Sequence, residues 1–287
     1  MITICKKEIR SYLTSMSGYV FLAFILLVVG IYFSAYHMTM GYPVFGYTLS
    51  AVTIMFLILV PVLTMRSLAE EQRQKTDQLL LTSPLSVKDI VIGKYLGMLA
   101  VFGIACLIIC LYPLIMSAYG EVSMSMSYLT IAGFFLLGAS NIAIGLFLSS
   151  LTESPVIAAV ITFGALFICF MMGSLTGILS TTASTSFLIF AIMILAAACI
   201  IYFVIKNTFL ALLIGIIGEG ALAAVYFAKP AMLEGAVHKV LGVFDITSHF
   251  NDFTNGMLDL SNVVYYLTII VLFLYFTTQS IQKRRWS

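Results

Sequence analysis

The feature that most constrains this chain is a series of long apolar runs separated by short polar segments. A membrane-spanning helix needs about 20 mostly apolar residues. Runs of this kind predict eight spans, at residues 19–36, 45–65, 93–116, 128–150, 155–175, 187–205, 209–227 and 263–281. Only 9% of the 287 residues are charged, whereas a soluble domain carries about 25%. The predicted fold is therefore all-α, a single polytopic transmembrane helical bundle with the lipid bilayer as its solvent.

The positions of Lys and Arg predict how the spans are oriented. Cytoplasmic loops of membrane proteins carry an excess of these residues. If the N-terminus is cytoplasmic, twelve of the fourteen basic residues fall in cytoplasmic segments, and Lys229 and Lys239 fall outside. We therefore expect a bacterial-type inner-membrane protein with an even number of spans and both termini in the cytoplasm. A net charge of +2 gives no reason to expect nucleic acid as a partner.

Residues 1–16 are expected to form an amphipathic helix in the membrane interface. Apolar residues recur there at helical spacing, and the basic residues fall on another side of the helix. The apolar set is Ile2, Cys5, Ile9, Tyr12 or Leu13, and Met16, and the basic set is Lys6, Lys7 and Arg10. The pattern leaves two roles open, a plain juxtamembrane anchor and a mechanical element.

Residues 66–92 form the long cytoplasmic segment of this topology, and their charges follow helical spacing. Glu70 and Arg73 are three residues apart, and Glu71 and Lys75 are four apart. Such pairs each stabilise a solvated helix by about 0.2–0.5 kcal/mol. The segment is therefore predicted to form a charged helix between two spans.

The second half of this segment carries signals for an apolar patch, a helix end and a new helix start. The apolar patch consists of Leu68, Leu79, Leu80 and Leu81. Pro84 disfavours helical geometry in the residue before it. Ser86, with Asp89 three residues later, predicts the N-cap of the helix that enters the third span. The whole segment, residues 66–92, reads as an elbow that could transmit force from a soluble partner.

The elbow resembles the signature of the type-2 ABC transporter permeases. That signature is E-E-R-x-x-G-T-x-E-L-L-L-T-x-P followed by V-x-G-K-x-L, and here it spans residues 70–84 and 91–96, with Lys75 in place of the usual glycine and Gln78 in place of the usual glutamate. The resemblance implies that a separate ABC ATPase subunit docks on the elbow and that a second permease subunit completes the pathway. The implied docking residues are Glu70, Glu71, Arg73, Thr76, Leu79, Leu80 and Pro84.

A second similarity lies near the C-terminus. Residues 248–259 and 283–286 resemble the subgroup that includes the gliding-motility permeases and the copper-processing permeases of nitrous-oxide reductase maturation. Type-2 permeases have a re-entrant pair of short helices here that gates the exit, which implies the same role for residues 229–262; a plain interfacial helix is the alternative. The implied gate residues are His249, Phe250, Asp252, Phe253 and Gly256. These relatives commonly have six spans, so residues 180–228 are expected to be an inserted helical hairpin.

The chain carries no motif for nucleotide hydrolysis, since G-x-x-x-x-G-K-[ST] is absent. We predict no catalytic, cofactor or metal site, and expect ATP hydrolysis in the partner. Glu219 is a candidate functional residue because an ionisable group at membrane depth costs about 2.5–3.5 kcal/mol; packing as a neutral group is the alternative. Asn141 is a weaker candidate, expected to bond to a neighbouring helix.

Three functions remain open at this point. The favoured one is the permease subunit of an ABC exporter. The second is an ABC-coupled membrane scaffold or mechanotransmitter for envelope assembly, and the third is a secondary transporter that needs no ATPase. An ABC ATPase gene beside this one would count against the third.

Overall fold

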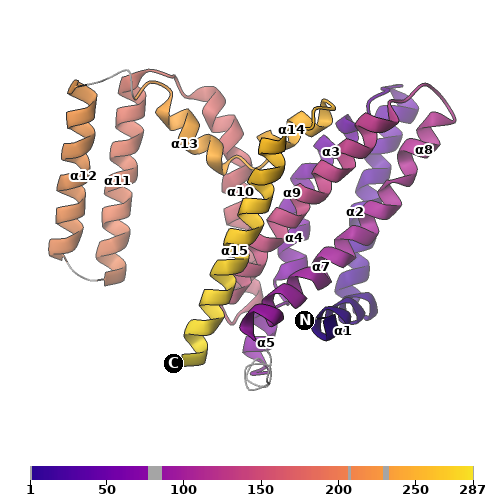
Figure 1. Ribbon diagram of the computed structural model, residues 1–287, viewed down its shortest axis with the longest axis horizontal. Helices are drawn as coiled ribbons and strands as arrows, with labels where there is room; N and C mark the ends of the chain where they lie inside the picture. The colour runs from indigo at the N-terminus through magenta and orange to yellow at the C-terminus, as the bar shows by residue number, and fades with distance from the viewer. Residues whose placement is uncertain (1, 77–85, 206–207, 229–232, 287) are drawn as a thin grey trace. The chain divides into compact units, whose positions relative to one another are not determined.

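The computed structural model describes residues 2–76, 86–205, 208–228 and 233–286, and its regular structure over these residues is helical (Figure 1). The prediction of an all-α fold is confirmed. Contacts divide the chain into two compact units. Unit 1 comprises Met1–Ile168 with Ile246–Ser287, and unit 2 comprises Cys169–Asp245.

The first part of unit 1 contains an N-terminal helix, two apolar helical segments and a short polar helix. Its elements are α1 (Ile2–Thr14), α2 (Met16–Phe33), the π-helix η1 (Ser34–Thr39), α3 (Gly46–Val52), the 3-10 turn η2 (Thr53–Met55), α4 (Phe56–Thr64) and α5 (Ala69–Arg73). Ser15 separates the first two helices, and its side chain accepts a hydrogen bond from the Gly18 N–H at the start of α2. The predicted N-terminal helix therefore ends at Thr14, and Met16 already belongs to the first span.

The remaining helices of unit 1 are longer. They are α7 (Val87–Ile109), α8 (Leu111–Ser117), α9 (Met124–Ser150), the first part of α10 (Pro155–Ile178), α14 (Ser248–Thr254) and α15 (Leu260–Trp286). The break after Ile109 has a local cause in Pro113. A proline lacks the N–H that would bond four residues back, and its ring clashes with the carbonyl at that position.

Helix α9 forms the centre of unit 1 and contacts α3, α4, α7, α14 and α15. Small residues allow these close approaches. A Cβ added at Gly133 would lie 2.5 Å from the Phe253 ring, and one at Gly145 would lie 2.6 Å from Thr64 Oγ1. Membrane helices commonly use glycine in this way, because van der Waals packing must replace the hydrophobic effect between helices in lipid.

Six helical segments among the described residues are long and apolar enough to cross a membrane: Met16–Thr39, Gly46–Arg73, Val87–Ser117, Met124–Ser150, Pro155–Ile178 and Leu260–Arg284. They coincide with six of the eight predicted spans. Unit 2 contains α11 (Ala183–Ile205) and α12 (Thr208–Ala228), which coincide with the other two, and the short α13 (Ala236–Phe244). The helices of the predicted hairpin are therefore present, and their crossing of the membrane stays a prediction.

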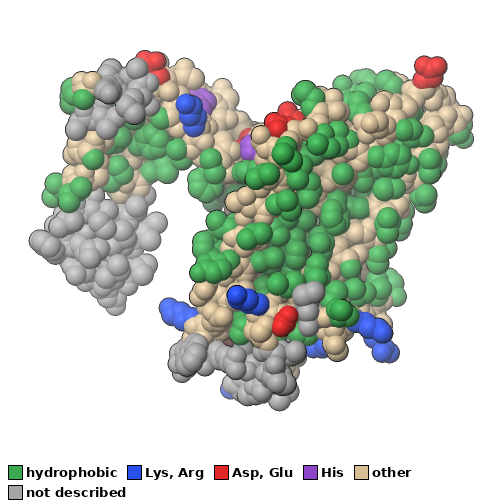
Figure 2. Space-filling model, in the orientation of Figure 1, with side chains coloured by type: hydrophobic (Ala, Val, Ile, Leu, Met, Phe, Trp, Pro, Cys, Tyr) green, Lys and Arg blue, Asp and Glu red, His purple; other side chains and the backbone are tan. Residues whose placement is uncertain are grey.

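One end of unit 1 holds the chain's N- and C-termini together with α1 and α5, and we call it the α5 end (Figure 1). Figure 2 shows an apolar surface along the visible face of this unit, with Lys and Arg side chains gathered at the α5 end. The opposite end carries α14.

Candidate functional site

Helix α5, the described core of the elbow, is hydrogen-bonded to the end of α9. The Ala69 N–H donates to Ser149 Oγ at 3.2 Å, and Gln72 Nε2 donates to the Ser150 carbonyl oxygen at 3.3 Å. Residues three apart lie on the same face of a helix. That face is buried against α9, while Arg73 on the other side is exposed.

The elbow helix ends sooner than its sequence predicts, at a residue with left-handed backbone. Lys75 has φ of 56°, the one positive φ among the described non-glycine residues. Its N–H donates to the Gln72 carbonyl at 3.1 Å, and the Thr76 N–H donates to the Glu71 carbonyl at 3.0 Å. This is the Schellman pattern, which favours glycine at the left-handed position. The glycine usual here in the type-2 permease signature fits that geometry, and Lys75 occupies it under strain.

The most informative feature of the α5 end is the buried side chain of Lys94. It is 1% exposed, and its ammonium group lies 2.7 Å from Glu71 Oε1 and 3.0 Å from Glu8 Oε1. It also donates to the Ser67 carbonyl at 3.0 Å. An ammonium group has three donors, so all of them are used. A buried charge is tolerated only when it is paired and hydrogen-bonded, and this cluster meets both conditions.

The cluster joins three elements that are distant in sequence. Glu8 belongs to α1, Glu71 to α5 and Lys94 to α7. The lysine lies about two turns after Ser86, which caps α7 by accepting the Asp89 N–H at 3.1 Å. That N-cap confirms the predicted start of α7. Because side chains follow the regular period of a helix, the start also determines on which side of α7 Lys94 lies.

Helix α1 is oriented toward the cluster by one buried face. Its buried residues are Ile4, Glu8 and Tyr12, spaced four apart. Tyr12 donates its hydroxyl to the Leu63 carbonyl at 3.0 Å, and burial, with a contribution from the nearby Glu8 carboxylate, raises the pKa of the Tyr12 phenol far above its usual value. Gly97 on α7 provides the space, since a Cβ there would lie 2.5 Å from Glu8 Cβ. The N-terminal helix is therefore docked on α7 as well as amphipathic.

The structure separates the predicted elbow residues into an inward group and an outward group. Glu71 points inward to Lys94. The predicted pair of Glu71 with Lys75 is wrong, because Lys75 lies beyond the end of the helix. Glu70 pairs with Arg66 (Nε to Oε2, 3.7 Å) instead of Arg73. Arg73 and Thr76 are exposed. Three further predicted docking residues, Leu79, Leu80 and Pro84, lie outside the described residues.

Sequence reasoning missed Glu8 and the role of Lys94. Lys94 carried a usable signal, because a lysine inside an apolar helix needs a partner. Glu8 carried a weaker one. It is the single acidic residue among the first 16, and it shares the Ile4–Tyr12 spacing, whereas the predicted apolar face was drawn through Ile2, Cys5 and Ile9.

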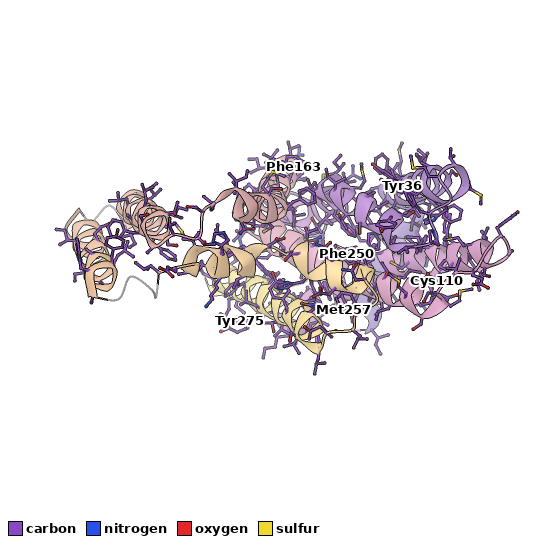
Figure 3. All side chains as sticks on the ribbon, turned by 90° about the horizontal axis from the view of Figure 1, so that it is seen from above. Tyr36, Cys110, Phe163, Phe250, Met257 and Tyr275 are labelled. Carbon is purple, nitrogen blue, oxygen red and sulfur yellow. The ribbon has the colours of Figure 1, made fainter. Side chains whose placement is uncertain are left out.

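The predicted gate residues lie on and just after α14. Phe250 and Phe253 are each 1% exposed, and the Phe253 carbonyl accepts the Thr130 hydroxyl of α9 at 3.0 Å. Viewed from the α14 end, Phe250 lies over the interior of unit 1, whereas Phe163 and Tyr275 lie toward opposite edges (Figure 3). The α14 end of the bundle is thus covered by buried aromatic rings.

The other three predicted gate residues have local structural roles. Gly256 (φ 78°) ends α14 in a second Schellman pattern, with the Met257 N–H donating to the Asp252 carbonyl at 2.9 Å. The Asp252 carboxylate accepts Asn262 Nδ2 at 2.6 Å, which ties α14 to α15. The His249 ring lies edge-on to Tyr265, with centroids 3.9 Å apart.

Two further candidates, Glu219 and Asn141, were predicted to lie at membrane depth. Glu219 lies on α12 in unit 2, and its Oε1 is buried without a hydrogen-bond partner in the described part of the chain. Asn141 is 7% exposed on α9, and the bond to a neighbouring helix expected for it is not among the hydrogen bonds of the described residues.

A search of the described residues for three or more His, Cys, Asp or Glu side chains that could hold a metal ion finds no such group. The fold is that of a polytopic helical membrane protein. Its sequence matches the model of the ABC-2 family transporter proteins over residues 42–278. The chain therefore belongs to this family, and it is a membrane permease of the ABC transporter class. A comparison with curated proteins finds no match.

Proposed function

We propose that this chain is the permease subunit of an ABC exporter, driven by a separate ATPase that docks on the elbow. The observation that supports this most is the attachment of α5. It is hydrogen-bonded to α9 and joined through Lys94 to α1 and α7. A force applied to a helix attached in this way reaches two membrane helices and the N-terminal helix together.

The elbow presents its free side to a partner. Arg73, Gln74, Lys75 and Thr76 are exposed, while Glu71 and its neighbour Gln72 face the permease. We propose that the ATPase contacts the exposed residues and that the inward residues pass its movement on. The family resemblance implies that Leu79 and Leu80 also contact the ATPase.

The proposed topology places the α5 end in the cytoplasm of a bacterial-type inner membrane. Support comes from the Lys and Arg side chains at that end (Figure 2) and from the positive-inside rule. A second permease subunit would complete the pathway, as the family resemblance implies. The proposed direction of transport, export rather than import, rests on the same resemblance.

A second candidate function is an ABC-coupled scaffold or mechanotransmitter for envelope assembly. The resemblance of residues 248–259 to the gliding-motility subgroup favours it. In this case the ATPase docks in the same way, but no cargo crosses. The aromatic cover formed by Phe250 and Phe253 would then transmit a change of shape instead of gating an exit.

The test is co-purification of the permease with the ABC ATPase encoded beside it. The variant Arg73→Glu with Lys75→Glu reverses two charges on the exposed side of the elbow, and it should co-purify with much less ATPase than the unmodified permease. The matched control is Lys6→Glu with Arg10→Glu, which reverses two exposed charges on α1 and should retain it. Leu79→Asp with Leu80→Asp should behave like the first variant.

Two results would contradict the proposal. Equal retention of the ATPase by the elbow variants and the control would place docking elsewhere. Failure of the unmodified permease to bind any ABC ATPase would favour a secondary transporter. With docking established, ATP-dependent efflux from cells or vesicles separates the exporter from the scaffold.

A further inference from the structure

The end of unit 1 that carries α14 has a small pocket between two connecting segments. One segment, residues 40–45, joins η1 to α3, and the other, residues 118–123, joins α8 to α9. The pocket has a volume of about 250 Å³. Pockets for drug-sized ligands measure about 300–1,000 Å³, so this one has room for a small group.

His37 holds one side of the pocket in place. Its Nδ1 donates to the Tyr42 carbonyl oxygen, and its Nε2 lies 2.9 Å from the Thr48 hydroxyl oxygen. The Tyr42 N–H in turn donates to the Tyr36 carbonyl at 3.0 Å. His37 belongs to the π-helix η1, a rare conformation that often occurs at functional sites. The segment that carries Tyr42 is therefore fixed from both of its backbone polar groups.

The walls of this pocket are mainly aromatic and apolar. Phe33, Tyr42 and Tyr119 contribute rings, and Met38 and Met116 contribute thioether side chains. Tyr42 is 46% exposed and Tyr119 is 82% exposed, so both rings are open to a ligand. Walls of this kind offer ring faces and few hydrogen-bond acceptors.

Glu121 gives the pocket a negative charge. Its side chain is exposed and has no hydrogen bond or ion pair among the described residues. The connecting segments at this end of unit 1, residues 34–45, 118–123 and 246–259, contain no Lys or Arg. Their other two carboxylates are already used, since Asp252 accepts from Asn262 and Asp259 accepts the Ser261 N–H at 2.9 Å. Glu121 is therefore the carboxylate left to meet a cation.

We propose that this pocket binds a quaternary ammonium group. The positive charge lies against the ring faces of Tyr42 and Tyr119 and beside the Glu121 carboxylate. Aromatic rings attract cations over their faces, and rings of this kind recognise choline and methylated ammonium groups. A primary ammonium has three N–H donors that need acceptors, which aromatic walls do not supply, whereas methyl groups need none.

The same chemistry is offered by a free solute and by the headgroup of phosphatidylcholine in the adjacent leaflet. The chemical class of the ligand is the proposal, and the experiment below separates the two sources. Binding at this pocket goes beyond the proposed function and does not depend on the ATPase.

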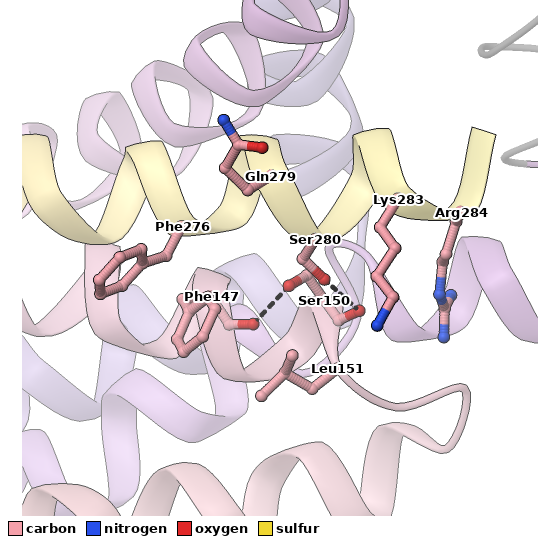
Figure 4. Close-up of a pocket in the computed structure, with 8 residues that line it drawn as sticks. All are labelled: Phe147, Ser150, Leu151, Phe276, Gln279, Ser280, Lys283 and Arg284. Atoms are coloured by element: carbon pink, nitrogen blue, oxygen red, sulfur yellow. Dashed lines mark hydrogen bonds between the residues drawn. The ribbon is translucent and has the colours of Figure 1, made fainter. Parts of the chain in front are cut away.

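A larger pocket at the α5 end, about 630 Å³ in volume, gives no comparable preference. Its lining includes Ser150, Ser280 and Lys283 (Figure 4). Both hydroxyls already donate, that of Ser150 to the Phe147 carbonyl and that of Ser280 to the Ser150 carbonyl. Lys283 already has an interaction partner as well. The polar lining of that pocket is thus largely engaged within the chain.

Binding is measured by isothermal titration calorimetry on the full-length permease in a maltoside detergent, which carries no choline group. The probes are choline, ethanolamine and dimethylbutanol, the neutral analogue of choline in which carbon replaces nitrogen. Dimethylbutanol should bind at least about fivefold more weakly than choline, since each ring facing a cation contributes about two- to fivefold. Ethanolamine should also bind more weakly, because its N–H donors lose water without gaining acceptors.

Two pairs of variants locate the site, and each changes an exposed side chain. Glu121→Gln should weaken choline binding by up to about fivefold, whereas Glu153→Gln, which removes the same charge between α9 and α10, should leave it unchanged. Tyr119→Leu keeps an apolar side chain and removes the ring face. It should weaken choline binding by about two- to fivefold without changing that of dimethylbutanol, and the control Tyr19→Leu on α2 should change neither.

Native mass spectrometry with phosphatidylcholine and phosphatidylglycerol identifies the source. A preference for phosphatidylcholine that Glu121→Gln removes would assign the pocket to a lipid headgroup. Choline binding without that preference would assign it to a free solute.

Four outcomes would overturn the proposal. Equal affinity for choline and ethanolamine would exclude recognition of the methyl groups, and equal affinity for choline and dimethylbutanol would mean an apolar pocket alone. Equal effects of the pocket variants and their controls would place binding elsewhere. Failure to bind both choline and phosphatidylcholine would remove the site altogether.

Discussion

Removal of the Lys94 ammonium group is the sharpest test of how the α5 end is held together. Lys94→Met keeps a long apolar side chain at a position that is 1% exposed. It leaves the Glu8 carboxylate, 9% exposed, without its partner, whereas Glu71 keeps Lys7 at 4.0 Å. Removing one member of a buried ion pair costs about 3–5 kcal/mol. We expect a loss of that size in the free energy of unfolding.

Removing the carboxylates should cost less. Glu8→Gln and Glu71→Gln each keep an oxygen that can accept from Lys94, and lose the charge that strengthens the bond, so about 1.5–3 kcal/mol is expected for each. The double variant Lys94→Met with Glu8→Gln should be less destabilised than the sum of its two single changes. The stranded charge is gone in that variant, and contacting residues typically couple by about 0.5–3 kcal/mol.

The assay is unfolding of the purified permease in mixed micelles with an increasing fraction of SDS. ATP hydrolysis by the complex is measured in parallel under conditions where each variant stays folded, and Lys94→Met should lower it. Two results would show that the cluster does not hold α1, α5 and α7 together. One is a free energy of unfolding for Lys94→Met within about 1 kcal/mol of that of the unmodified protein. The other is a destabilisation of the double variant equal to the sum of its two single changes.

Two further changes test neighbouring details. Lys75→Gly should raise the free energy of unfolding by about 1 kcal/mol, because left-handed geometry costs a non-glycine residue about that much. A lower free energy of unfolding in the same micelle assay would show that Lys75 is not strained at this turn. Gly97→Ala should displace α1, since the new Cβ would lie 2.5 Å from Glu8 Cβ. The control Gly103→Ala on the same helix meets nothing nearer than Phe135 at 3.8 Å. Equal reactivity of Cys5 on α1 in both variants would argue against this packing.

Local sequence signals were enough to predict six of the membrane helices and the start of one of them. Apolar runs predict spans because lipid satisfies no backbone polar group, so the chain must satisfy its own backbone by forming helices. The predicted Ser86 cap is similarly local. The break before Pro113 is also local, but the predicted span 93–116 ran through it. These features depend on residues within a few positions of one another. The six long apolar helices confirm six of the predicted spans.

The pairing of charges, in contrast, became visible only in the folded chain. Lys94 lies 86 residues from Glu8 and 23 from Glu71, and i,i+4 spacing favoured Lys75 as the partner of Glu71. That expectation failed for two reasons. The left-handed residue ends the helix first, and leaving the buried Lys94 ammonium group without a partner would cost far more than a solvated pair on the helix surface contributes. Charge pairing across elements depends on packing, and packing is not a property of any short stretch of sequence.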